Sequence, residues 1–210
     1  YVRLMELLFA SQNEHKRIEM ASLLLPHSIK LPSEIGIEFS YEEIADSFVG
    51  NALGKAEHLY NLTHKPSFAD DSGLIVDALQ GAPGIYSARY GSDLFDHELS
   101  AAEKNLFLLR NLEHIPPEQR TARFVCAIAL IFTPYQRYII QEAVEGFIAQ
   151  HPSGEGGFGY DPIFLVGTGT KAMAQFTDSE KNNISHRALA AQKIASILQD
   201  IEQKEIVYVC

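Results

Sequence analysis

The chain has 210 residues, of which 46% are hydrophobic and 21% charged, the composition of an ordinary globular protein. Its formal net charge of -10 at pH 7 argues against a general DNA- or RNA-binding surface, because such a surface needs a basic stripe. A small anionic ligand remains possible, since a few local cations and backbone N–H groups can hold a phosphate.

Cysteine usage and hydropathy predict a cytoplasmic protein without a membrane partner. Cys126 and Cys210 are the only cysteines, and they lie far apart without the spacing of a metal site, which indicates reduced thiols. No apolar run approaches membrane-spanning length. The opening "YVRLMELLFASQNEHK" lacks the long apolar core of a signal peptide, so we expect no export signal there.

The beginning of the chain predicts a strand, a loop and a helix. "LMELLFA" (4–10) is a short apolar run, "SQNEHK" (11–16) is polar, and "RIEMASLLL" (17–25) has apolar residues at helical spacing. The free N–H groups of this helix would face the loop, where Asn13 and Lys16 add a donor and a charge. An anion site is one interpretation and a plain connection is the other, because the loop lacks the G-x-x-x-x-G-K-[ST] pattern of a phosphate loop.

A second helix is predicted across "SFVGNALGKAEHLYNLT" (47–63), with Phe48, Ala52, Ala56 and Leu59 on one face. These four positions recur at three- and four-residue spacing, as one buried face of a helix requires.

"SFADDSGLIVDAL" (67–79) is predicted to have a turn-rich centre between apolar flanks. Two adjacent carboxylates would be costly there unless they were paired or bound to a metal, and Mg²⁺ prefers such oxygen ligands. Glu42 and Glu43, before the second helix, could complete a metal site. An Asx turn is the structural alternative.

The second half of the chain predicts a loop, a helix and then strands. "GAPGIYSARYG" (81–91) is a loop by its glycines and proline, and "ELSAAEKNLFLLRNL" (98–112) has helical spacing. "RTARFVCAIALIF" (120–132), "RYIIQEAVEGFIA" (137–149) and "YDPIFLV" (160–166) are β-branched and aromatic runs separated by turn signals. The fold class is therefore α/β with a mixed sheet, and no linker divides residues 1–210.

"GEGGFGYD" (154–161) matches the pattern G-x-G-x-x-G in form, starting at Gly154. A dinucleotide site is excluded because a strand, not a helix, is predicted to follow. The glycines around Phe158 and Tyr160 could let a flat ring lie against an aromatic face. A glycine hairpin with aromatic core residues is the alternative.

"ISHRALAAQKIASILQ" (184–199) predicts an amphipathic helix with Ser185 as its N-cap. His186 and Arg187 would occupy the first turn, where the helix dipole disfavours cations. Two donors at this place indicate a ligand, while a solvated helix start remains the simpler interpretation.

Taken together, these stretches resemble the inosine/xanthosine triphosphate pyrophosphatases, which remove non-canonical purine nucleotides from the nucleotide pool. The matching segments are the loop at 13–16, "FVGNALGKA", "ADDSGL", "GAPGIYSARYG", "GGFGYDPIF", Lys181 and "SHR", and they occur in family order. The resemblance implies an elongated mixed β-sheet flanked by helices, in a single domain of two lobes with the active-site cleft between them. It also implies a homodimer.

The resemblance further implies Mg²⁺-dependent hydrolysis of ITP, dITP and XTP to the nucleoside monophosphate and pyrophosphate. Asp71 would be the general base and a metal ligand, and Glu42 the second metal carboxylate, with Glu43 as the alternative. The residues implied to hold the triphosphate are Ser11, Gln12, Asn13, Glu14, His15, Lys16 and Ser72. Those implied to contact the base and sugar are Phe158, Gly159, Tyr160, Asp161 and Lys181, with Phe158 stacking on the purine.

His186 and Arg187 would donate to the 6-oxo group of the base. Adenine carries an amino group at that position, so donors would face a donor, and a site built on hydrogen bonds rejects such an analogue strongly. Guanine shares the 6-oxo group, so its exclusion would have to arise at the 2-position.

The chain departs from the family pattern at two positions. Gly50 replaces the usual glutamate, which removes a carboxylate near the metal, and Ala45 replaces the usual glycine. A nucleotide sensor without catalysis and a pyrophosphatase for pyrimidine triphosphates are rival hypotheses. Asp71 favours catalysis, and "GGFGYD" together with "SHR" favours purines. A purely structural protein would leave these clusters without a role.

Overall fold

The computed structural model describes the backbone of residues 4–207 and the side chains of residues 4–203, so Cys210 lies outside the described residues. Its strands are β1 (Glu6–Phe9), β2 (Ser28–Lys30), β3 (Ser67–Val76), β4 (Thr121–Thr133), β5 (Gln136–Ile148) and β6 (Phe164–Val166). Its α-helices are α1 (Glu14–Leu23), α2 (Phe48–Thr63), α3 (Ala101–Asn111), α4 (Asp178–Ile184) and α5 (His186–Val207).

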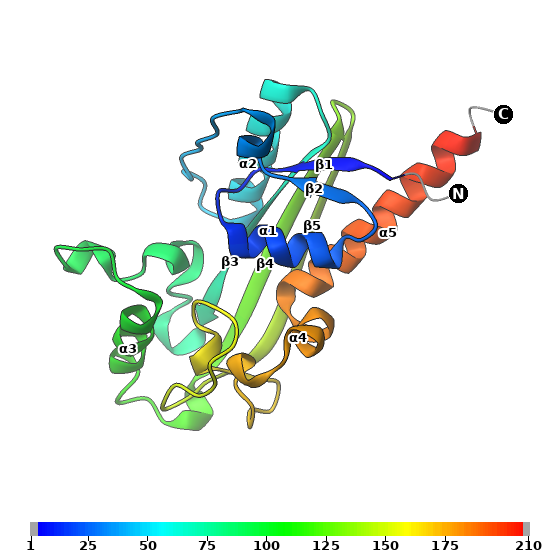
Figure 1. Ribbon diagram of the computed structural model, residues 1–210. Coiled ribbons are helices and arrows are strands. Elements are labelled where there is room, and N and C mark those ends of the chain that lie inside the picture. The colour runs from blue at the N-terminus through cyan, green and yellow to red at the C-terminus, as the bar shows by residue number, and fades with distance from the viewer. Residues whose placement is uncertain (1–3, 208–210) are drawn as a thin grey trace. The chain divides into compact units, whose positions relative to one another are not determined.

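The six strands form one sheet in the order β2-β1-β3-β4-β5-β6 (Figure 1). β1 pairs in parallel with both β2 and β3, whereas β5 and β6 pair antiparallel. β4 and β5 are neighbours joined by the short turn at 134–135, as in an antiparallel hairpin. The predicted α/β class with a mixed sheet is confirmed.

Side-chain caps explain where three of the helices begin. Asn13 Oδ1 accepts from the Lys16 N–H, so α1 starts at Glu14, before the predicted apolar run. Ser47 caps α2 in the same way, and Ser100 and Glu103 form a capping box at α3. These polar contacts satisfy backbone donors that would otherwise lack a partner in the first turn.

Two predicted segments differ from the structure. The turn-rich centre expected in 67–79 is wrong, because the carboxylate pair lies within the continuous strand β3 and an Asx turn is absent there. β3 pairs with β1 through Ser67 and Phe68 and has β4 as its other neighbour, so its place inside the sheet keeps it extended despite its turn-forming residues. The strand expected over 160–166 starts only at Phe164, because Asp161–Ile163 forms a 3₁₀ turn with Pro162 in it.

The chain divides into two compact units. The first unit contains residues 1–71, 126–142 and 187–210, and the second contains residues 72–125 and 143–186. The chain therefore passes from one unit to the other inside β3, β4 and β5 and at the start of α5. The implied cleft between two lobes stays a prediction.

The core of the first unit joins strands to α1 and α5. Leu7 and Phe9 of β1 and Phe68 of β3 pack with Met20 of α1 and Ile194 of α5. The Phe9 and Phe68 rings stack with centroids 4.6 Å apart. Figure 1 shows α1 and α5 on the same side of these strands, as their shared core requires.

The core of the second unit is built around α3 and β4. Leu108 and Leu112 from the end of α3 pack with Phe124 of β4, Phe164 of β6 and Met173. The Phe124 and Phe164 rings are 4.4 Å apart, so two strands of the sheet meet through aromatic contact.

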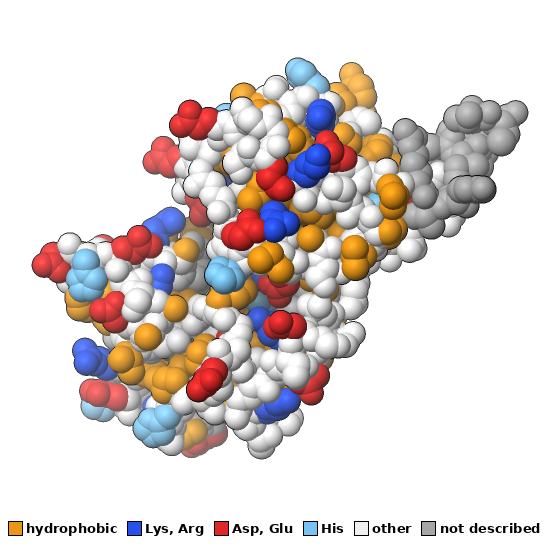
Figure 2. Space-filling view, viewed as in Figure 1, with side chains coloured by type: hydrophobic (Ala, Val, Ile, Leu, Met, Phe, Trp, Pro, Cys, Tyr) orange, Lys and Arg blue, Asp and Glu red, His pale blue; other side chains and the backbone are white. Residues whose placement is uncertain are grey.

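The surface agrees with the charge balance of the sequence. On the face drawn in Figure 2, acidic and basic side chains are interspersed, and the basic ones form no continuous stripe. Within residues 4–207, no helix combines the length and apolar character needed to cross a membrane.

Cys126 provides a test of the first core. Its thiol is fully buried, and this burial raises its pKa to about 12. In a Cys210→Ser variant, we expect no reaction with a thiol reagent in native buffer at mildly alkaline pH and full reaction in denaturant. A native reaction rate like that of a free peptide thiol would contradict the packing described here.

Candidate active site

The acidic pair Asp70–Asp71 lies in the middle of β3, and both side chains are buried, with 1% and 6% of their surface exposed. Successive side chains of a strand point to opposite faces of the sheet. The two carboxylates therefore have different partners, although they are neighbours in sequence. Both partner sets described next belong to the first unit.

Asp70 is the centre of a buried ion-pair network. Its Oδ1 lies 3.0 Å from Lys16 Nζ, and its Oδ2 accepts from Arg187 Nε at 3.2 Å and Nη2 at 3.1 Å. Arg187 Nη1 also donates to Glu19 Oε2 at 2.6 Å, and its side chain is only 2% exposed. Residues from α1, β3 and α5 are thus joined by charge-assisted hydrogen bonds.

The network holds Asp70 in its ionised form. Burial alone would raise the pKa of Asp70, but the positive charges of Lys16, Arg187 and Lys55 outweigh it and lower that pKa far below its usual value. Burial would likewise lower the pKa of Arg187, and the carboxylates of Asp70 and Glu19 raise it instead.

Asp71 faces α2. Its Oδ2 accepts from Asn51 Nδ2 at 3.1 Å, and its Oδ1 lies 3.8 Å from Lys55 Nζ. Lys55 Nζ also donates to Glu43 Oε1 at 2.5 Å. Asn51 Oδ1 accepts from the Ala45 N–H at 3.1 Å, so one amide connects Asp71 to the segment that carries the glutamates.

The electrostatics of Asp71 are opposite to those of Asp70. Burial raises the pKa of Asp71, the negative charge of Glu43 adds to the rise, and Lys55 and Asn51 counter it only in part. Burial lowers the pKa of Lys55, but the charges of Asp70, Asp71 and Glu43 outweigh it, so that pKa is raised. A buried carboxylate with a raised pKa beside a cation is typical of a functional group.

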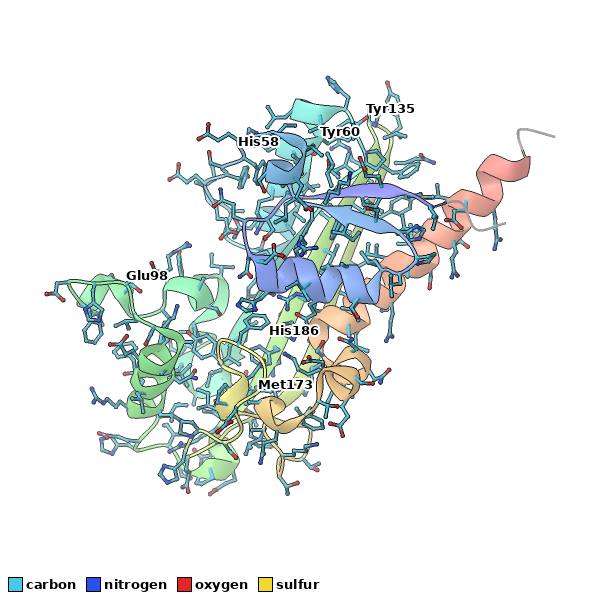
Figure 3. The ribbon with its side chains drawn as sticks, viewed as in Figure 1. His58, Tyr60, Glu98, Tyr135, Met173 and His186 are labelled. Atoms are coloured by element: carbon cyan, nitrogen blue, oxygen red, sulfur yellow. The ribbon has the colours of Figure 1, made fainter. Side chains whose placement is uncertain are left out.

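Close packing on α2 fixes the segment that carries Glu42 and Glu43. His58, labelled in Figure 3, has ring contacts with Phe39 and Tyr41, at centroid distances of 5.7 and 5.8 Å. A Cβ atom on Gly54 would lie 1.9 Å from the Tyr41 hydroxyl, so only glycine allows this approach. The segment is therefore held against the helix that presents Asn51 and Lys55.

The residues around Asp71 fit Mg²⁺. This ion is usually bound by one or two carboxylates together with substrate phosphate oxygens, and Glu43 and Asp71 supply two carboxylates around one cation. Glu42 is exposed, so the geometry favours Glu43, the alternative ligand. Among the described residues, no group of three or more His, Cys, Asp or Glu side chains could hold a metal without such outside ligands.

The loop Ser11–Lys16 joins β1 to α1, as predicted. Ser11 Oγ accepts from the Asn13 N–H at 3.0 Å, and Gln12 Nε2 donates to the Phe39 carbonyl at 2.5 Å. Asn13 caps the helix through its Oδ1, which leaves its Nδ2 as the donor expected from the sequence. Glu14 and His15 are exposed at the start of α1. The N-terminus of α1, Asn13 Nδ2 and Lys16 are the elements of this loop suited to an anion.

In the second unit, Phe158, Asp161 and Lys181 lie together. Asp161 Oδ2 accepts from the Phe158 N–H and from Lys181 Nζ, both at 2.9 Å. Lys181 Nζ lies 5.2 Å from the centroid of the Phe158 ring, within cation–π range. Phe158 is 37% exposed, whereas Asp161 and Lys181 are buried. An exposed ring beside a buried cation can accept a flat, polar ligand.

The remaining predicted residues lie in different surroundings. His186 begins α5 and stacks on Phe124 in the second unit, with centroids 4.8 Å apart and planes at 15° (Figure 3). Arg187, the next residue, belongs to the Asp70 network of the first unit. Their shared role at the base stays a prediction. Ser72 is a half-buried residue of β3. The Tyr160 hydroxyl donates to the Ser87 carbonyl.

The sequence analysis gave no individual role to Asn51, Lys55 and Glu19, and it treated Asp70 only as one of two adjacent carboxylates that need a partner or a metal. A signal for the first two was present, because they lie three and four residues from members of the predicted apolar face of α2. Polar residues within an apolar stripe need partners in the core. No periodicity indicated which face of the sheet each aspartate would meet.

Comparisons with known proteins agree on one family. The model of the Ham1 family matches residues 7–197. The dITP/XTP pyrophosphatase of Treponema denticola is 44% identical over 93% of this chain and 99% of its own length. That of Bacillus subtilis strain 168 is 42% identical over 92% of this chain and 97% of its own.

Solved structures show the same similarity. A HAM1 protein from Coxiella burnetii has a TM-score of 0.83 and 38% identity, covering 94% of this chain and 100% of that chain. The Ham1 protein of Staphylococcus aureus has a TM-score of 0.82 and 36% identity, covering 93% and 98%.

The Asp70 network predicts a large loss of stability in Asp70→Asn. Removing one partner leaves buried cations uncompensated, which costs about 3–5 kcal/mol of unfolding free energy. Asp77→Asn is the matched control, because Asp77 is 43% exposed in its pair with Arg123, and breaking an exposed pair costs about 1 kcal/mol or less.

The pH dependence of the unfolding free energy should also change in Asp70→Asn. The pKa of Asp70 is lower in the folded protein than in the unfolded protein. The stability that its charge contributes is therefore fully present at a pH above the unfolded pKa, and it is lost as the pH falls from there through the folded pKa. Denaturant unfolding of Asp70→Asn, with a chelator present, should therefore show a shallower loss of stability below about pH 4 than the wild type. Equal costs for Asp70→Asn and Asp77→Asn would contradict the network.

Proposed function

Because the chain belongs to the Ham1 family, we propose that it is a nucleoside-triphosphate pyrophosphatase that hydrolyses ITP, dITP and XTP. The products are the nucleoside monophosphate and pyrophosphate, so deaminated purines are kept out of DNA and RNA. One observation carries the proposal beyond the family: Asp71 is a buried carboxylate with a raised pKa, held by Asn51 and Lys55. Such a group suits a general base.

Asp71 would orient and deprotonate the attacking water. Water is a weak nucleophile, so a positioned carboxylate lowers the barrier by taking its proton as the bond to phosphorus forms. The hydrogen bond from Asn51 fixes the carboxylate, and the nearby Lys55 ammonium places positive charge where the phosphates would bring negative charge.

Mg²⁺ fits this site, with Asp71 and Glu43 as its carboxylate ligands and Glu42 as the alternative. When bound, the ion neutralises charge on the polyphosphate. The Lys55 ammonium group already contacts the carboxylates of Glu43 and Asp71, so Mg²⁺ would share these carboxylates with Lys55.

The triphosphate would bind at Ser11–Lys16 and Ser72. Lys16 lies in the first turn of α1, where free N–H groups and the helix dipole attract anions. Asp70 holds the Lys16 ammonium at this place while leaving it 18% exposed. A phosphate oxygen could therefore become a second acceptor for an ammonium group that is already oriented.

For the base, we propose stacking on Phe158 beside Lys181, with Gly159, Tyr160 and Asp161 in the same segment. His186 and Arg187 would donate to the 6-oxo group. A guanidinium carries five N–H donors, so Arg187 could bind a carbonyl while it keeps its contacts with Asp70 and Glu19. We further propose a homodimer and a cytoplasmic location, the compartment in which a nucleotide pool is cleaned.

A substrate panel tests the function. Inosine, xanthosine, adenosine, guanosine and thymidine triphosphates should be compared with and without Mg²⁺, with pyrophosphate and orthophosphate measured separately. We expect pyrophosphate from the inosine and xanthosine nucleotides only when Mg²⁺ is present. Binding without turnover would favour a sensor, and a preference for the thymidine nucleotide would favour a pyrimidine enzyme.

Asp71→Asn should lower turnover on inosine triphosphate by at least about 10²-fold, because it removes a general base. Substrate affinity, measured by equilibrium binding, should change much less. The amide keeps the size of the side chain and still offers an oxygen to Asn51. Near-normal turnover of this variant would remove Asp71 from the catalytic role.

Lys16→Ala should raise KM and also lower kcat, because a cation at a phosphate acts in both the ground state and the transition state. Arg17→Ala is the control, since Arg17 lies next in α1 and pairs with the exposed Glu14. Steady-state kinetics with inosine triphosphate measure both constants. If neither constant changes in Lys16→Ala, this loop does not bind the triphosphate.

A further inference from the structure

Two buried side chains tie the segment Gly157–Asp161 to the rest of the second unit, Tyr160 from within the segment and Asn105 from α3. The Tyr160 hydroxyl donates to the Ser87 carbonyl at 2.9 Å, and Asn105 Nδ2 donates to the Gly159 carbonyl at 3.1 Å. Tyr160 is 6% exposed and Asn105 is 4% exposed. Both contacts lie within the second unit, and they attach neighbouring residues of the segment to two different elements.

The Ser87 anchor is itself fixed. Ser87 Oγ accepts from the Leu74 N–H of β3 at 2.8 Å and donates to the Gly84 carbonyl at 2.6 Å. A hydrogen-bonded chain therefore runs from the sheet through Ser87 to the Tyr160 hydroxyl. The segment "GAPGIYSARYG" has no role in the proposed chemistry. Through Ser87 it is hydrogen-bonded to the segment that carries Phe158.

The held segment has a backbone that only a few residue types can adopt. Gly157 and Gly159 have φ values of 72° and 61°, and a Cβ atom on Gly157 would lie 2.0 Å from Asp161 Oδ2. In this conformation the Phe158 ring stays partly exposed and lies within cation–π range of Lys181. The ring position therefore depends on a segment whose backbone requires glycine and which is tied to neighbouring elements.

The buried Asn105 side chain carries a polar atom that lowers the stability of the fold. Its Oδ1 is buried and has no hydrogen-bond partner among the described residues. Burying an unsatisfied polar atom destabilises a fold, and Leu108 and Leu112 nearby in the chain show that apolar side chains pack well at the end of this helix. The Asn105 side chain lowers the stability of the fold through its Oδ1 and at the same time donates to the Gly159 carbonyl. This combination indicates that its role is to position the segment.

We propose that Tyr160 and Asn105 are positioning residues for the base-binding platform formed by the Phe158 ring and the Lys181 ammonium. They hold Gly157–Asp161 by two carbonyl hydrogen bonds, and neither needs to touch the nucleotide. The resemblance implies that Tyr160 contacts the substrate, whereas this proposal assigns it a supporting role. The inference rests on the proposed function, because it assumes that a purine base stacks on Phe158.

The chain offers a matched control for each support. Tyr90→Phe also removes a phenol hydroxyl in the second core, where Tyr90 accepts from Asn111 Nδ2 at 3.0 Å. Asn111→Leu changes the same residue type as Asn105→Leu on the same helix α3, but at an exposed position. The two substitutions of each pair remove the same functional group, a phenol hydroxyl or an amide. Only one substitution of each pair removes a hydrogen bond that holds Gly157–Asp161.

The experiment measures inosine triphosphate kinetics and product inhibition for Tyr160→Phe, Asn105→Leu and both controls. A platform that binds the base equally in ground and transition states affects KM rather than kcat. We expect KM to rise about 3- to 10-fold in Tyr160→Phe and Asn105→Leu, the size of one neutral hydrogen bond, with kcat within about 2-fold. The controls should match the wild type.

Product inhibition separates positioning from a general loss of structure. Inosine monophosphate carries the base, so its inhibition constant should rise with KM, whereas that of pyrophosphate should stay unchanged. Asn105→Leu removes a buried unsatisfied oxygen but also one hydrogen bond, so its melting temperature should stay close to that of the wild type.

Three outcomes would overturn the inference. The first is KM values for Tyr160→Phe and Asn105→Leu equal to those of their controls. The second is weaker inhibition by pyrophosphate in parallel with inosine monophosphate, which would show a structural role only. The third is a wild type that releases no pyrophosphate from inosine triphosphate, which would overturn the proposed function as well. Active wild type with unchanged variants overturns the inference alone.

Discussion

Alternation along β3 is the constraint on which the first unit's site depends. A strand sends successive side chains to opposite faces, so two adjacent carboxylates cannot share one set of partners. Asp70 meets Lys16 and Arg187, whereas Asp71 meets Asn51 and Lys55. One dipeptide therefore connects α1 and α5 through its first residue and α2 through its second.

The separation also divides the chemistry. Two carboxylates in one pocket would raise each other's pKa and titrate as a pair. Here Asp70 has a lowered pKa because cations surround it, and it can serve as a permanent anion that orients Lys16. Asp71 has a raised pKa because it is buried near Glu43 and has weaker compensation. A fixed anchor and a proton acceptor thus arise from neighbouring residues of the same type.

The sequence predicted the parts of this arrangement that depend on local physics. Helical spacing predicted α2 and α3, and the loop before α1 was placed correctly. The turn predicted within 67–79 was wrong because turn propensity takes no account of the place of β3 in the sheet between β1 and β4. The partners of Asp70 could not be predicted either, since Arg187 lies 117 residues away and long-range contact leaves no periodic signal.

Ala45 and Gly50, the two positions at which the chain departs from the pattern that the resemblance implies, approach each other closely. A Cβ atom on Gly50 would lie 2.7 Å from the Cβ of Ala45, a distance that two such carbons do not adopt. With alanine at 45, a side chain at position 50 would require the Ala45 segment to shift, and Ser47 Oγ, 3.1 Å from the same Cβ position, restricts the space further. The missing carboxylate at position 50 is therefore sterically coupled to the methyl group of Ala45. Because the Ala45 N–H also binds Asn51 Oδ1, this contact lies directly beside the support of Asp71. The carboxylates that we propose as Mg²⁺ ligands, Glu43 and Asp71, lie close to this contact, with Lys55 as their counter-charge.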